Sequence, residues 1–320
     1  MHAIHSDPDG ALRWAEAPDP IAGPGELVVR VAACGVNRAD LLQRRGLYPP
    51  PHGASPILGL EAAGEVLELG PGVQGWTAGA PCMALLAGGG YAQRVAVDAR
   101  HVLPLPPGVD PIHAAALMEA FVTAYLNLVV LGELKVGERV LIHGGSGGVG
   151  TAAIQLANAL DAAVWASARG SKAEQVRALG ATQTFDYLAP DFAAQLHAAG
   201  HFDVVLDVLG AKGLSMNLEL LAPDGRLLLV GLLGGRRAEV DLLPILSRRL
   251  TVRGSTLRAL PAERKAELIA AFARDVLPLF ADGRLRPLVD RSFPIAEADA
   301  AHARMQAGEH VGKLVLEVPA

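Results

Sequence analysis

The chain has 320 residues, of which 51% are hydrophobic and 19% are charged, and its formal net charge at pH 7 is −5. This composition can bury a sizeable core and excludes a disordered chain, while the acidic balance argues against a nucleic-acid partner. The most apolar stretch, residues 114–134, contains Glu119, Asn127 and Glu133, so it is not predicted to span a membrane. The amino terminus lacks the basic start and apolar segment of a secretory signal, and a cytoplasmic location is expected.

Residues 1 to about 110 are predicted to be rich in β structure. Short apolar runs bounded by glycine and proline occur at Glu26–Val36, Gly64–Gly70 and Tyr91–Val97, which is typical of strands separated by turns. The spacing then changes and predicts a helix over residues 111–128, with a proline in its first turn.

From Glu138 onward, apolar strands alternate with helical segments. The runs RVLIHG, AAVWASA, VVLDVLG and RLLLVGLLG are continuously apolar, as expected for parallel strands covered by helices on both faces. A last strand of this series is predicted at residues 250–256, followed by a long helix over residues 262–282 and further β structure. The order predicts an α/β fold in which a Rossmann doubly wound parallel sheet, residues 119–256, is inserted in a β-rich catalytic domain formed by residues 1–118 and 257–320.

The segment between the first of these strands and the next helix is rich in glycine. It fits the pattern G-x-G-x-x-G, and the predicted binding residues are Gly145, Gly147, Gly148, Val149 and Gly150. Between a buried strand and a helix, such glycines permit a tight bend, and the free N–H groups of the helix bind a pyrophosphate. The motif therefore predicts a dinucleotide site, with a plain glycine-rich turn as the alternative.

The next strand bears on the choice between NADPH and NADH. A site that prefers NADH carries an acidic residue about 20 residues after the glycines, whereas this region offers Ser167, Arg169 and Lys172 and no acid before Glu174. Arginine and lysine attract a 2′-phosphate, so the predicted cofactor is NADPH, with Tyr187 beside the same phosphate. The alternative is that both cations are solvated surface charges and that Tyr187 is an ordinary half-buried tyrosine.

Several motifs follow one another in an order typical of one superfamily. They are AACGVNRAD (residues 32–40), GLEAAGEVLELGPGV (residues 59–73), GGGYAQRVAV (residues 88–97) and the glycine-rich turn. With them, the whole chain resembles the medium-chain dehydrogenase/reductase superfamily. NRADLLQRRGLYPPP, followed by ILGLEAAGEVLELGPGV, is most similar to its zinc-free quinone oxidoreductases, the zeta-crystallin-like branch, and there to the p53-inducible NADPH:quinone oxidoreductase type. The resemblance implies that the β-rich domain is GroES-like.

The resemblance also implies that no metal is bound. Where zinc-dependent relatives have a cysteine and a histidine ligand, this chain has Asn37 and Leu60, which supply neither a thiolate nor an imidazole. The chain has only 2 cysteines, too few for a structural zinc site. Glu61 is then expected to be a buried, paired structural carboxylate, and Cys34 to pack as a small apolar side chain.

By the same resemblance, Asn37, Asp40 and Tyr48 line the cleft beside the nicotinamide. Asn37 would hydrogen-bond the cofactor or the substrate, and Tyr48 would stack on the acceptor or donate a proton or hydrogen bond to its oxygen. Structural roles are the alternatives. Asn37 would cap a helix that begins at Arg38, Asp40 would lie in its first turn, and Tyr48 would pack in a proline-rich loop.

Three further cofactor contacts are implied by the resemblance: Thr123, Gly231 and Leu232, the last two at the carboxyl end of a later strand. A hydroxyl satisfied within its helix and a turn glycine are the alternatives for Thr123 and Gly231. His143, beside the glycine turn, is expected to be a hydrogen-bonded structural histidine, and Lys313 is expected to be solvated.

Together these features predict an NADPH-dependent oxidoreductase that transfers hydride to quinones without a metal, and they leave one- and two-electron reduction open. One alternative is reduction of the C=C bond of an enone or enoyl thioester. Arg44, Arg45 and Arg258 are candidate cations for a thioester arm, although a surface role is expected for them. Another alternative is a non-catalytic NADPH-binding protein. The strand at residues 250–256 is expected to present an edge that pairs with a second copy in a homodimer.

Overall fold

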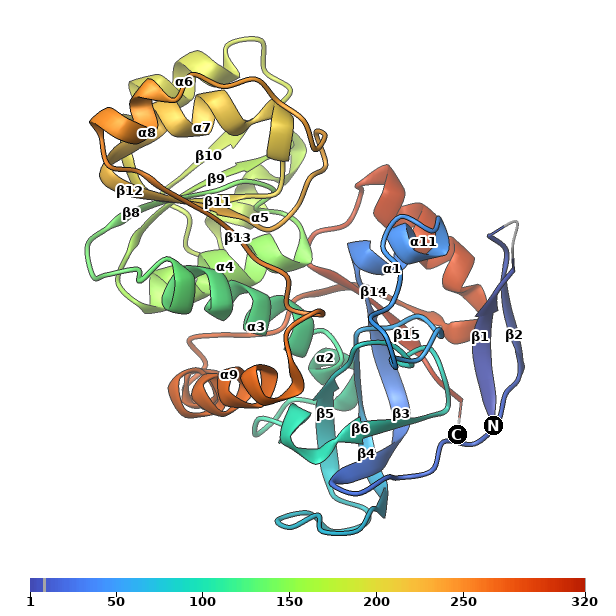
Figure 1. Ribbon diagram of the computed structural model, residues 1–320. Helices are drawn as coiled ribbons and strands as arrows, with labels where there is room; N and C mark the ends of the chain where they lie inside the picture. The colour runs from blue at the N-terminus through green and yellow to red at the C-terminus, as the bar shows by residue number, and fades with distance from the viewer. Residues whose placement is uncertain (8–9, 320) are drawn as a thin grey trace. The chain divides into compact units, whose positions relative to one another are not determined.

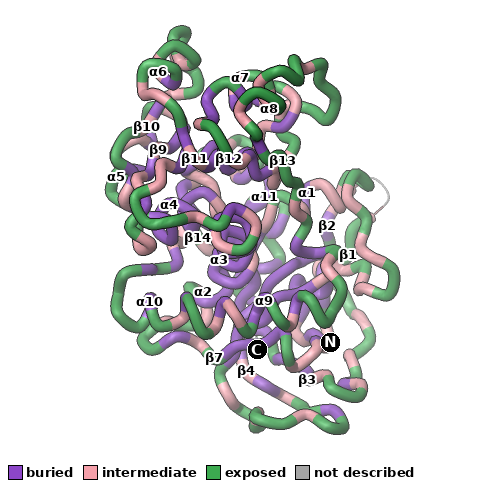
Figure 2. Tube along the Cα trace, turned by 60° about the vertical axis from the view of Figure 1, so that its left-hand side comes forward, coloured by how far each residue is buried: buried purple, intermediate pink, exposed green. Residues whose placement is uncertain are grey.

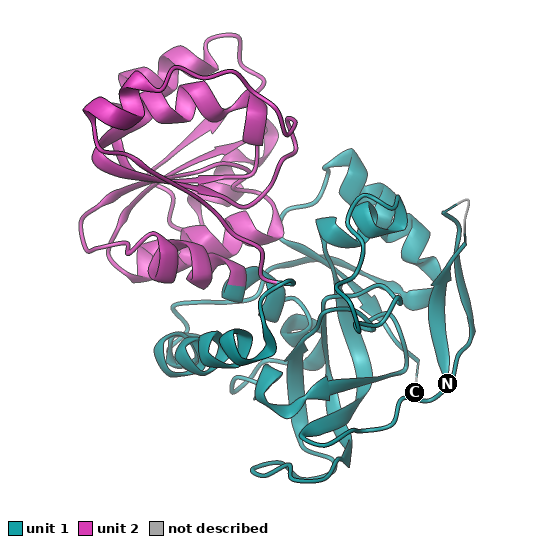
Figure 3. Cartoon of the chain, viewed as in Figure 1, with its two compact units in different colours: residues 1–122, 258–320 teal, residues 123–257 magenta. Residues whose placement is uncertain are grey.

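The computed structural model describes residues 1–7 and 10–319, which form two compact units (Figure 3). The first unit contains residues 1–122 and 258–320, and the second contains residues 123–257. The predicted fold class is confirmed, because the second unit is a doubly wound parallel sheet and the first is rich in β structure.

The first unit is built on a mostly antiparallel sheet. Its strand order is β14-β15-β3-β4-β5-β7, with β6 also paired to β3, and a separate hairpin joins β1 and β2. The strands are β1 (His2–Ser6), β2 (Leu12–Glu16), β3 (Glu26–Val36), β4 (Glu61–Leu69), β5 (Pro81–Leu85), β6 (Arg94–Asp98), β7 (Val102–Pro104), β14 (Val289–Pro294) and β15 (Lys313–Glu317). β15 runs beside β3 (Figure 1), and its register pairs Leu314 with Val36 and Val315 with Gly35. This pairing places the carboxyl-terminal strand next to the AACGVNRAD motif.

Helices of the first unit pack around this sheet. They are α1 (Arg38–Arg44), α2 (Pro111–Ala114), α9 (Ala262–Asp275), α10 (Leu277–Ala281) and α11 (Ala298–Ala307), with the 3-10 turns Ala99–His101 and Ile295–Glu297. The prediction of a single helix over residues 262–282 is wrong, because this segment is divided into α9 and α10 at Val276. Pro278 lies in the first turn of α10, and a proline there has no N–H group to continue the bonding of α9.

The helix predicted over residues 111–128 is also divided. A turn separates α2 from α3 (Met118–Tyr125), and α3 continues into a π-helical segment, Leu126–Leu131. The N–H group of Gly132 donates to Asn127 O at 2.7 Å, which is the wider bonding of a π turn. The apolar spacing runs through the turn without interruption, so the sequence does not mark this break.

The second unit contains a sheet with the strand order β10-β9-β8-β11-β12-β13, and neighbouring strands run parallel. The strands are β8 (Arg139–Ile142), β9 (Ala163–Ala168), β10 (Gln183–Asp186), β11 (Phe202–Asp207), β12 (Leu221–Leu229) and β13 (Thr251–Gly254). The order reverses between β8 and β11, and ligands bind doubly wound sheets outside the carboxyl ends of the strands at such a point.

Helices cover both faces of this parallel sheet. They are α4 (Gly148–Ala159), α5 (Ala173–Arg177), α6 (Phe192–Ala198), α7 (Leu214–Leu220) and α8 (Leu243–Ser247), with the 3-10 turns Gly170–Lys172 and Gly210–Lys212. In Figure 1, α7 and α8 lie on one face and α4 lies on the other. The central strands are therefore buried on both sides (Figure 2), which explains their continuously apolar sequences.

Candidate active site

The glycine-rich segment of the second unit forms the predicted turn between β8 and α4. Gly144 has a φ of +69°, in the left-handed region that favours glycine, and the N–H group of Gly145 donates to Ser167 O at 2.8 Å. α4 begins at Gly148, and Gly147 precedes it as the N-cap. The first N–H groups of α4 therefore lie at the carboxyl end of β8, where a helix of this kind can hold a phosphate.

The glycines of the motif are required for different physical reasons. A Cβ atom on Gly150 would lie 2.2 Å from Gly144 O, and one on Gly145 would lie 2.9 Å from Ala166 Cβ. Both positions are therefore needed for close packing of the turn. A Cβ on Gly147 would meet only Gly144 O, at 3.4 Å, so Gly147 lies on the open side of the turn, where a ligand could approach the backbone.

The expectation that His143 is a hydrogen-bonded structural histidine is confirmed. Its Nδ1 lies 2.9 Å from Ser167 Oγ, its Nε2 lies 2.8 Å from Asn217 Oδ1, and burial lowers its pKa. Ser167 is 2% exposed, so its hydroxyl faces the ring of His143 rather than solvent. The pair therefore fixes the end of β9 against the end of β8.

Residues after β9 are those predicted to recognise a 2′-phosphate. Arg169 Nε donates to Tyr187 Oη at 3.1 Å, which brings together two of the predicted residues from consecutive strand ends. Lys172 is 8% exposed, so the alternative of a solvated surface charge is wrong for this residue. Asp186 introduces a negative charge nearby, because its Oδ2 would lie 2.6 Å from a Cβ on Gly170.

The other three predicted cofactor contacts also belong to the second unit. Thr123, in α3, is 6% exposed, and its carbonyl oxygen accepts a hydrogen bond from Asn127 Nδ2 at 2.8 Å. Gly231 follows β12 at the carboxyl edge of the sheet, and the neighbouring Leu232 is 56% exposed. Leu232 thus offers an apolar surface at the edge where doubly wound sheets bind ligands. Cofactor binding by all three stays a prediction.

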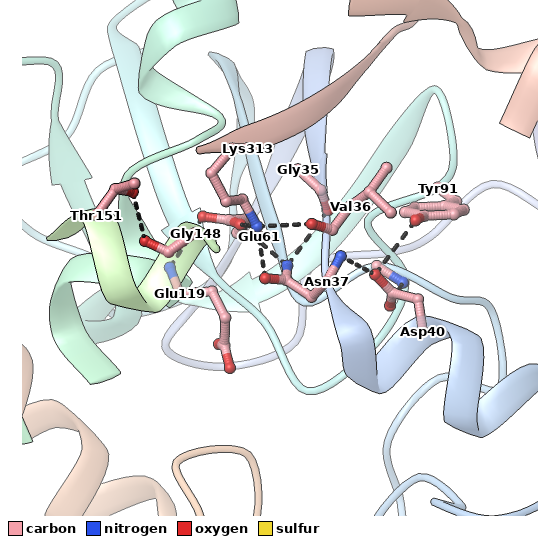
Figure 4. A network of polar contacts seen from close by, with 11 residues as sticks. Gly35, Val36, Asn37, Asp40, Glu61, Tyr91, Glu119, Gly148, Thr151 and Lys313 are labelled. Carbon is pink, nitrogen blue, oxygen red and sulfur yellow. Dashed lines mark hydrogen bonds and ion pairs between the residues drawn. The ribbon is translucent and has the colours of Figure 1, made fainter. Parts of the chain in front are cut away.

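A buried ion pair forms the centre of a polar network in the first unit (Figure 4). Lys313 Nζ lies 2.7 Å from Glu61 Oε1, and the two side chains are 4% and 0% exposed. Lys313 also donates to Val36 O at 2.7 Å and to Asn37 Oδ1 at 2.5 Å. The expectation of a solvated Lys313 is wrong, because the pairing of β15 with β3 inserts it beside these residues. The expectation of a buried, paired Glu61 is confirmed.

Asn37 is bound within this network at both ends of its amide. Its Nδ2 donates to Glu61 Oε1 at 3.0 Å and lies 3.4 Å from Gly35 O, while its Oδ1 accepts the hydrogen bond from Lys313. Asn37 also precedes α1 as the N-cap, and its backbone N–H group donates to Asp40 Oδ2 at 2.7 Å. The cap is therefore formed by the Asp40 carboxylate, which leaves the Asn37 amide to the ion pair.

Asp40 is a buried carboxylate that accepts hydrogen bonds from several donors. It accepts hydrogen bonds from Asn37 N–H, from Gly59 N–H at 3.0 Å and from Tyr91 Oη at 3.2 Å. Tyr91 Oη in turn lies 3.1 Å from His302 Nε2. Burial raises the pKa of Asp40 to about 6 and lowers that of His302 to about 4. Asp40 thus joins α1, the turn at residue 59 and α11.

The residues at the zinc-ligand positions of related dehydrogenases do not fit a zinc ion. Asn37 offers an amide that is already engaged, Leu60 offers a buried isobutyl group, and the ammonium of Lys313 lies within hydrogen-bond distance of that amide. A second cation beside Lys313 would be repelled in this dry environment. Across residues 1–7 and 10–319, no three His, Cys, Asp or Glu side chains gather in a way that could hold a metal ion.

Tyr48 lies beside a buried arginine of the same unit. The guanidinium of Arg258 lies 5.4 Å from the centre of the Tyr48 ring, and it donates to Ala87 O and Gln43 Oε1, both at 2.7 Å. The prediction of a surface role for Arg258 is wrong, because this residue is 3% exposed and forms hydrogen bonds with segments far apart in the sequence. Burial raises the pKa of Tyr48.

Glu119 is a feature of this unit that the sequence reasoning missed as a functional candidate. Its N–H group donates to Glu61 Oε2 at 2.9 Å, so it is attached directly to the buried ion pair. Burial, reinforced by the charge of Glu61, raises its pKa to about 8. The signal in the sequence was an acidic residue within the apolar stretch at residues 114–134, which was used there only to exclude a membrane span.

Comparisons with known proteins identify the class to which this fold and site belong. Residues 23–107 match the family model of an alcohol dehydrogenase GroES-like domain, and residues 179–316 match that of a zinc-binding dehydrogenase. A human synaptic vesicle membrane protein VAT-1 homolog is 33% identical over 95% of this chain and 82% of that protein. The polyketide synthase GfsB of Streptomyces halstedii is 36% identical over 96% of this chain, which spans only 5% of that much longer protein.

Solved structures agree with this classification. The CurK enoyl reductase has a TM-score of 0.88 and 28% identity, over 99% of both chains. Mycobacterial Rv1454c, solved as a complex with NADPH, also has a TM-score of 0.88 and 28% identity, over 99% of this chain and 100% of that one. The protein is thus an oxidoreductase built from a GroES-like unit and a Rossmann unit. It belongs to the medium-chain dehydrogenase/reductase superfamily, whose members bind a nicotinamide cofactor. Within the described residues, no helix has the length and apolar character needed to cross a membrane.

Proposed function

We propose that this protein is an NADPH-dependent reductase of conjugated carbonyl acceptors, with quinones as the leading substrate class and no metal in the reaction. The observation that carries the proposal is the network of Lys313, Glu61 and Asn37, in which an engaged amide occupies one zinc-ligand position and an ammonium lies beside it. Without a Lewis acid, the acceptor itself must stabilise the charge that develops on its oxygen. Quinones and conjugated enones do so by delocalisation.

The second unit supplies the binding of the cofactor in this proposal. NADPH, when bound, supplies the hydride, and the protein supplies orientation and electrostatics. The N–H groups of Gly148 and Val149, in the first turn of α4, would hold the pyrophosphate. Arg169 and Tyr187, already joined by a hydrogen bond, would bind the 2′-phosphate. Lys172 adds positive charge to the same loop.

In this proposal, quinones rank above enoyl thioesters because of the state of the three arginines that could bind a thioester arm. The phosphate-bearing arm of a thioester needs free cations, and the three candidates are engaged elsewhere. Arg258 is buried, Arg44 pairs with Asp299 at 2.6 Å, and Arg45 donates to Gln306 at 2.5 Å. Reduction of an enoyl thioester is nevertheless the second candidate, because an enoyl reductase is among the structural relatives.

The proposed function is tested by following the absorbance of reduced nicotinamide. NADPH and NADH are each supplied with an alkylated para-quinone, with a crotonyl thioester or with no acceptor. Quinone-dependent oxidation of NADPH is the expected result. Turnover with the thioester alone would favour the enoyl reductases, and tight binding of NADPH without turnover would favour a non-catalytic binding protein.

The choice of NADPH leads to a prediction for Arg169→Ala. Loss of a charge-assisted contact to the 2′-phosphate, worth about 1.5–3 kcal/mol, should raise the KM for NADPH about 10- to 100-fold and leave the KM for NADH unchanged. Steady-state kinetics with both cofactors measure this difference. Arg177→Ala, an exposed arginine on the neighbouring α5, is the matched control and should have no effect. An equal loss with NADPH and NADH would contradict the assignment.

We also propose that the protein is a homodimer that pairs through β13. All four residues of this strand are exposed at the sheet edge, and Val252 is accompanied by exposed leucines at positions 242, 243 and 246. Val252→Glu places a charge on that edge, so it should convert the dimer to a monomer in analytical ultracentrifugation. A wild-type protein that sediments as a monomer at micromolar concentration would contradict the proposal.

A further inference from the structure

The side chain of Glu119 has an unusual environment for a carboxyl group near an ion pair. Its backbone is anchored to Glu61, but its side chain extends away from Glu61 (Figure 4). Its Oε2 is buried and has no hydrogen-bond partner among the described residues. A buried carboxylate oxygen without a donor is costly, whereas a protonated carboxyl group can keep its hydrogen for an incoming acceptor. The geometry therefore favours the neutral form of Glu119 and points to a ligand oxygen as its missing partner.

The charges around Glu119 come from several elements of the first unit. Its pKa is raised first by burial, then by Glu61 of β4 and more weakly by Asp40 of α1, and it is lowered by Lys313 of β15 and Lys265 of α9. The effects that raise the pKa dominate, so a pKa of about 8 leaves the Glu119 carboxyl group mostly protonated at pH 7. Glu61 differs from it in being paired directly with Lys313.

Glu119 also interacts electrostatically with Tyr48, the residue predicted to face the acceptor. Burial raises the pKa of Tyr48 most, the charge of Glu119 raises it further, and the charge of Arg258 lowers it. Burial lowers the pKa of Arg258, and the charge of Glu119 opposes that change. Asp40 is 1% exposed and accepts hydrogen bonds from three donors, whereas Glu119 is intermediate in exposure and its buried Oε2 has no hydrogen-bond partner in the described part of the chain.

We propose that Glu119 is the general acid that protonates the oxygen of the acceptor, an inference that rests on the proposed reductase function. NADPH, when bound, would supply a hydride with its electron pair from C4 of the nicotinamide. The hydride would bond to the β-carbon of the conjugated acceptor, and the π electrons would shift to the carbonyl oxygen. The O–H bond of Glu119 breaks, and the proton moves to that oxygen. The acceptor is reduced by two electrons, the nicotinamide is oxidised, and the Glu119 carboxylate regains a proton from water.

Tyr48 is a weaker candidate for this proton transfer. A general acid works best when its pKa lies near the working pH, and the raised pKa of the Tyr48 hydroxyl lies further from neutrality than that of Glu119. Tyr48 is suited instead to position the acceptor by stacking or by a hydrogen bond. Glu61 is unsuited because its charge is held by Lys313.

The test compares the wild type with Glu119→Gln, which keeps the size of the side chain and removes its acidic proton. Because the protonated form is the active one, kcat of the wild type should be high below pH 8 and fall as the pH rises through about 8. At pH 7, Glu119→Gln should reduce an alkylated quinone about 100-fold more slowly and should show no such fall. The loss of rate should be smaller with a tetrahalogenated quinone, because the oxyanion of its product is more stable and depends less on protonation.

Two controls separate this inference from the proposed function. Glu68→Gln, at an exposed glutamate of the same unit, should retain both the rate and the pH profile. Infrared spectra with isotope-labelled glutamate should show a protonated carboxyl band that disappears near pH 8 in the wild type and is absent in Glu119→Gln. Wild-type turnover with an unchanged rate and profile in Glu119→Gln would overturn the role of Glu119 alone. Absence of turnover in the wild type with every acceptor would overturn the proposed function, and with it this role.

Discussion

Replacing Lys313 by methionine should lower the free energy of unfolding by about 3–5 kcal/mol. The substitution keeps an apolar stem of similar length but removes the ammonium, which leaves Glu61, at 0% exposed, as an uncompensated buried charge. The same change removes the hydrogen bonds from Lys313 Nζ to Val36 O and to Asn37 Oδ1. Urea denaturation, followed by circular dichroism at pH 7, measures the loss.

The double variant Lys313→Met/Glu61→Gln is the control for this prediction. It removes both charges, so it should recover a large part of the stability lost in the single variant. Arg264→Met serves as a second control, since Arg264 pairs with Glu267 on the exposed face of α9 and should contribute no more than about 1 kcal/mol. A loss below that level in Lys313→Met would mean that the buried pair contributes little to the fold.

Replacing Gly150 by alanine should disrupt the cofactor turn. The added Cβ would lie 2.2 Å from Gly144 O and 2.8 Å from Gly145 Cα, which are backbone atoms that cannot move without displacing the start of α4. Overpacking of this kind destabilises by about 1–3 kcal/mol or more, and the displaced N–H groups could no longer hold a pyrophosphate. We therefore expect a lower Tm and a loss of NADPH affinity of at least about 100-fold, measured by thermal unfolding and by calorimetric titration.

Gly147→Ala is the matched variant in the same turn. Its Cβ would meet only Gly144 O at 3.4 Å, so the apoprotein should keep nearly all of its stability. A methyl group on the open side of the turn should still weaken NADPH binding, because the backbone could no longer approach the phosphates closely. If Gly147→Ala bound NADPH as tightly as the wild type, the cofactor would have to lie elsewhere.

The local sequence was sufficient to predict most of the architecture of the second unit, although α6 and α8 were not among the predicted helices. Continuous apolar runs gave the buried parallel strands, helical spacing gave the intervening helices, and the glycine motif gave the turn at Gly145 to Gly150. Each of these signals is contained within a few neighbouring residues, because strand and helix periodicities and the conformational needs of glycine are local properties. Helix ends were predicted less well, as the break at Val276 shows.

The polar chemistry of the first unit was decided by tertiary structure. Lys313 and Asn37 are 276 residues apart in the sequence and meet only because β15 pairs with β3. Arg258 and Gln43 are 215 residues apart and form a hydrogen bond only in the folded first unit. A charge is predicted to be solvated unless its partner is known, and no local pattern identifies a partner at such a distance.

The sequence by itself therefore determined the fold class and the location of the cofactor turn. Only the tertiary structure decided which charges are buried and which are paired, because burial and pairing depend on contacts between distant segments. The same holds for Glu119, whose N–H group binds Glu61 and whose Oε2 has no partner among residues 1–7 and 10–319.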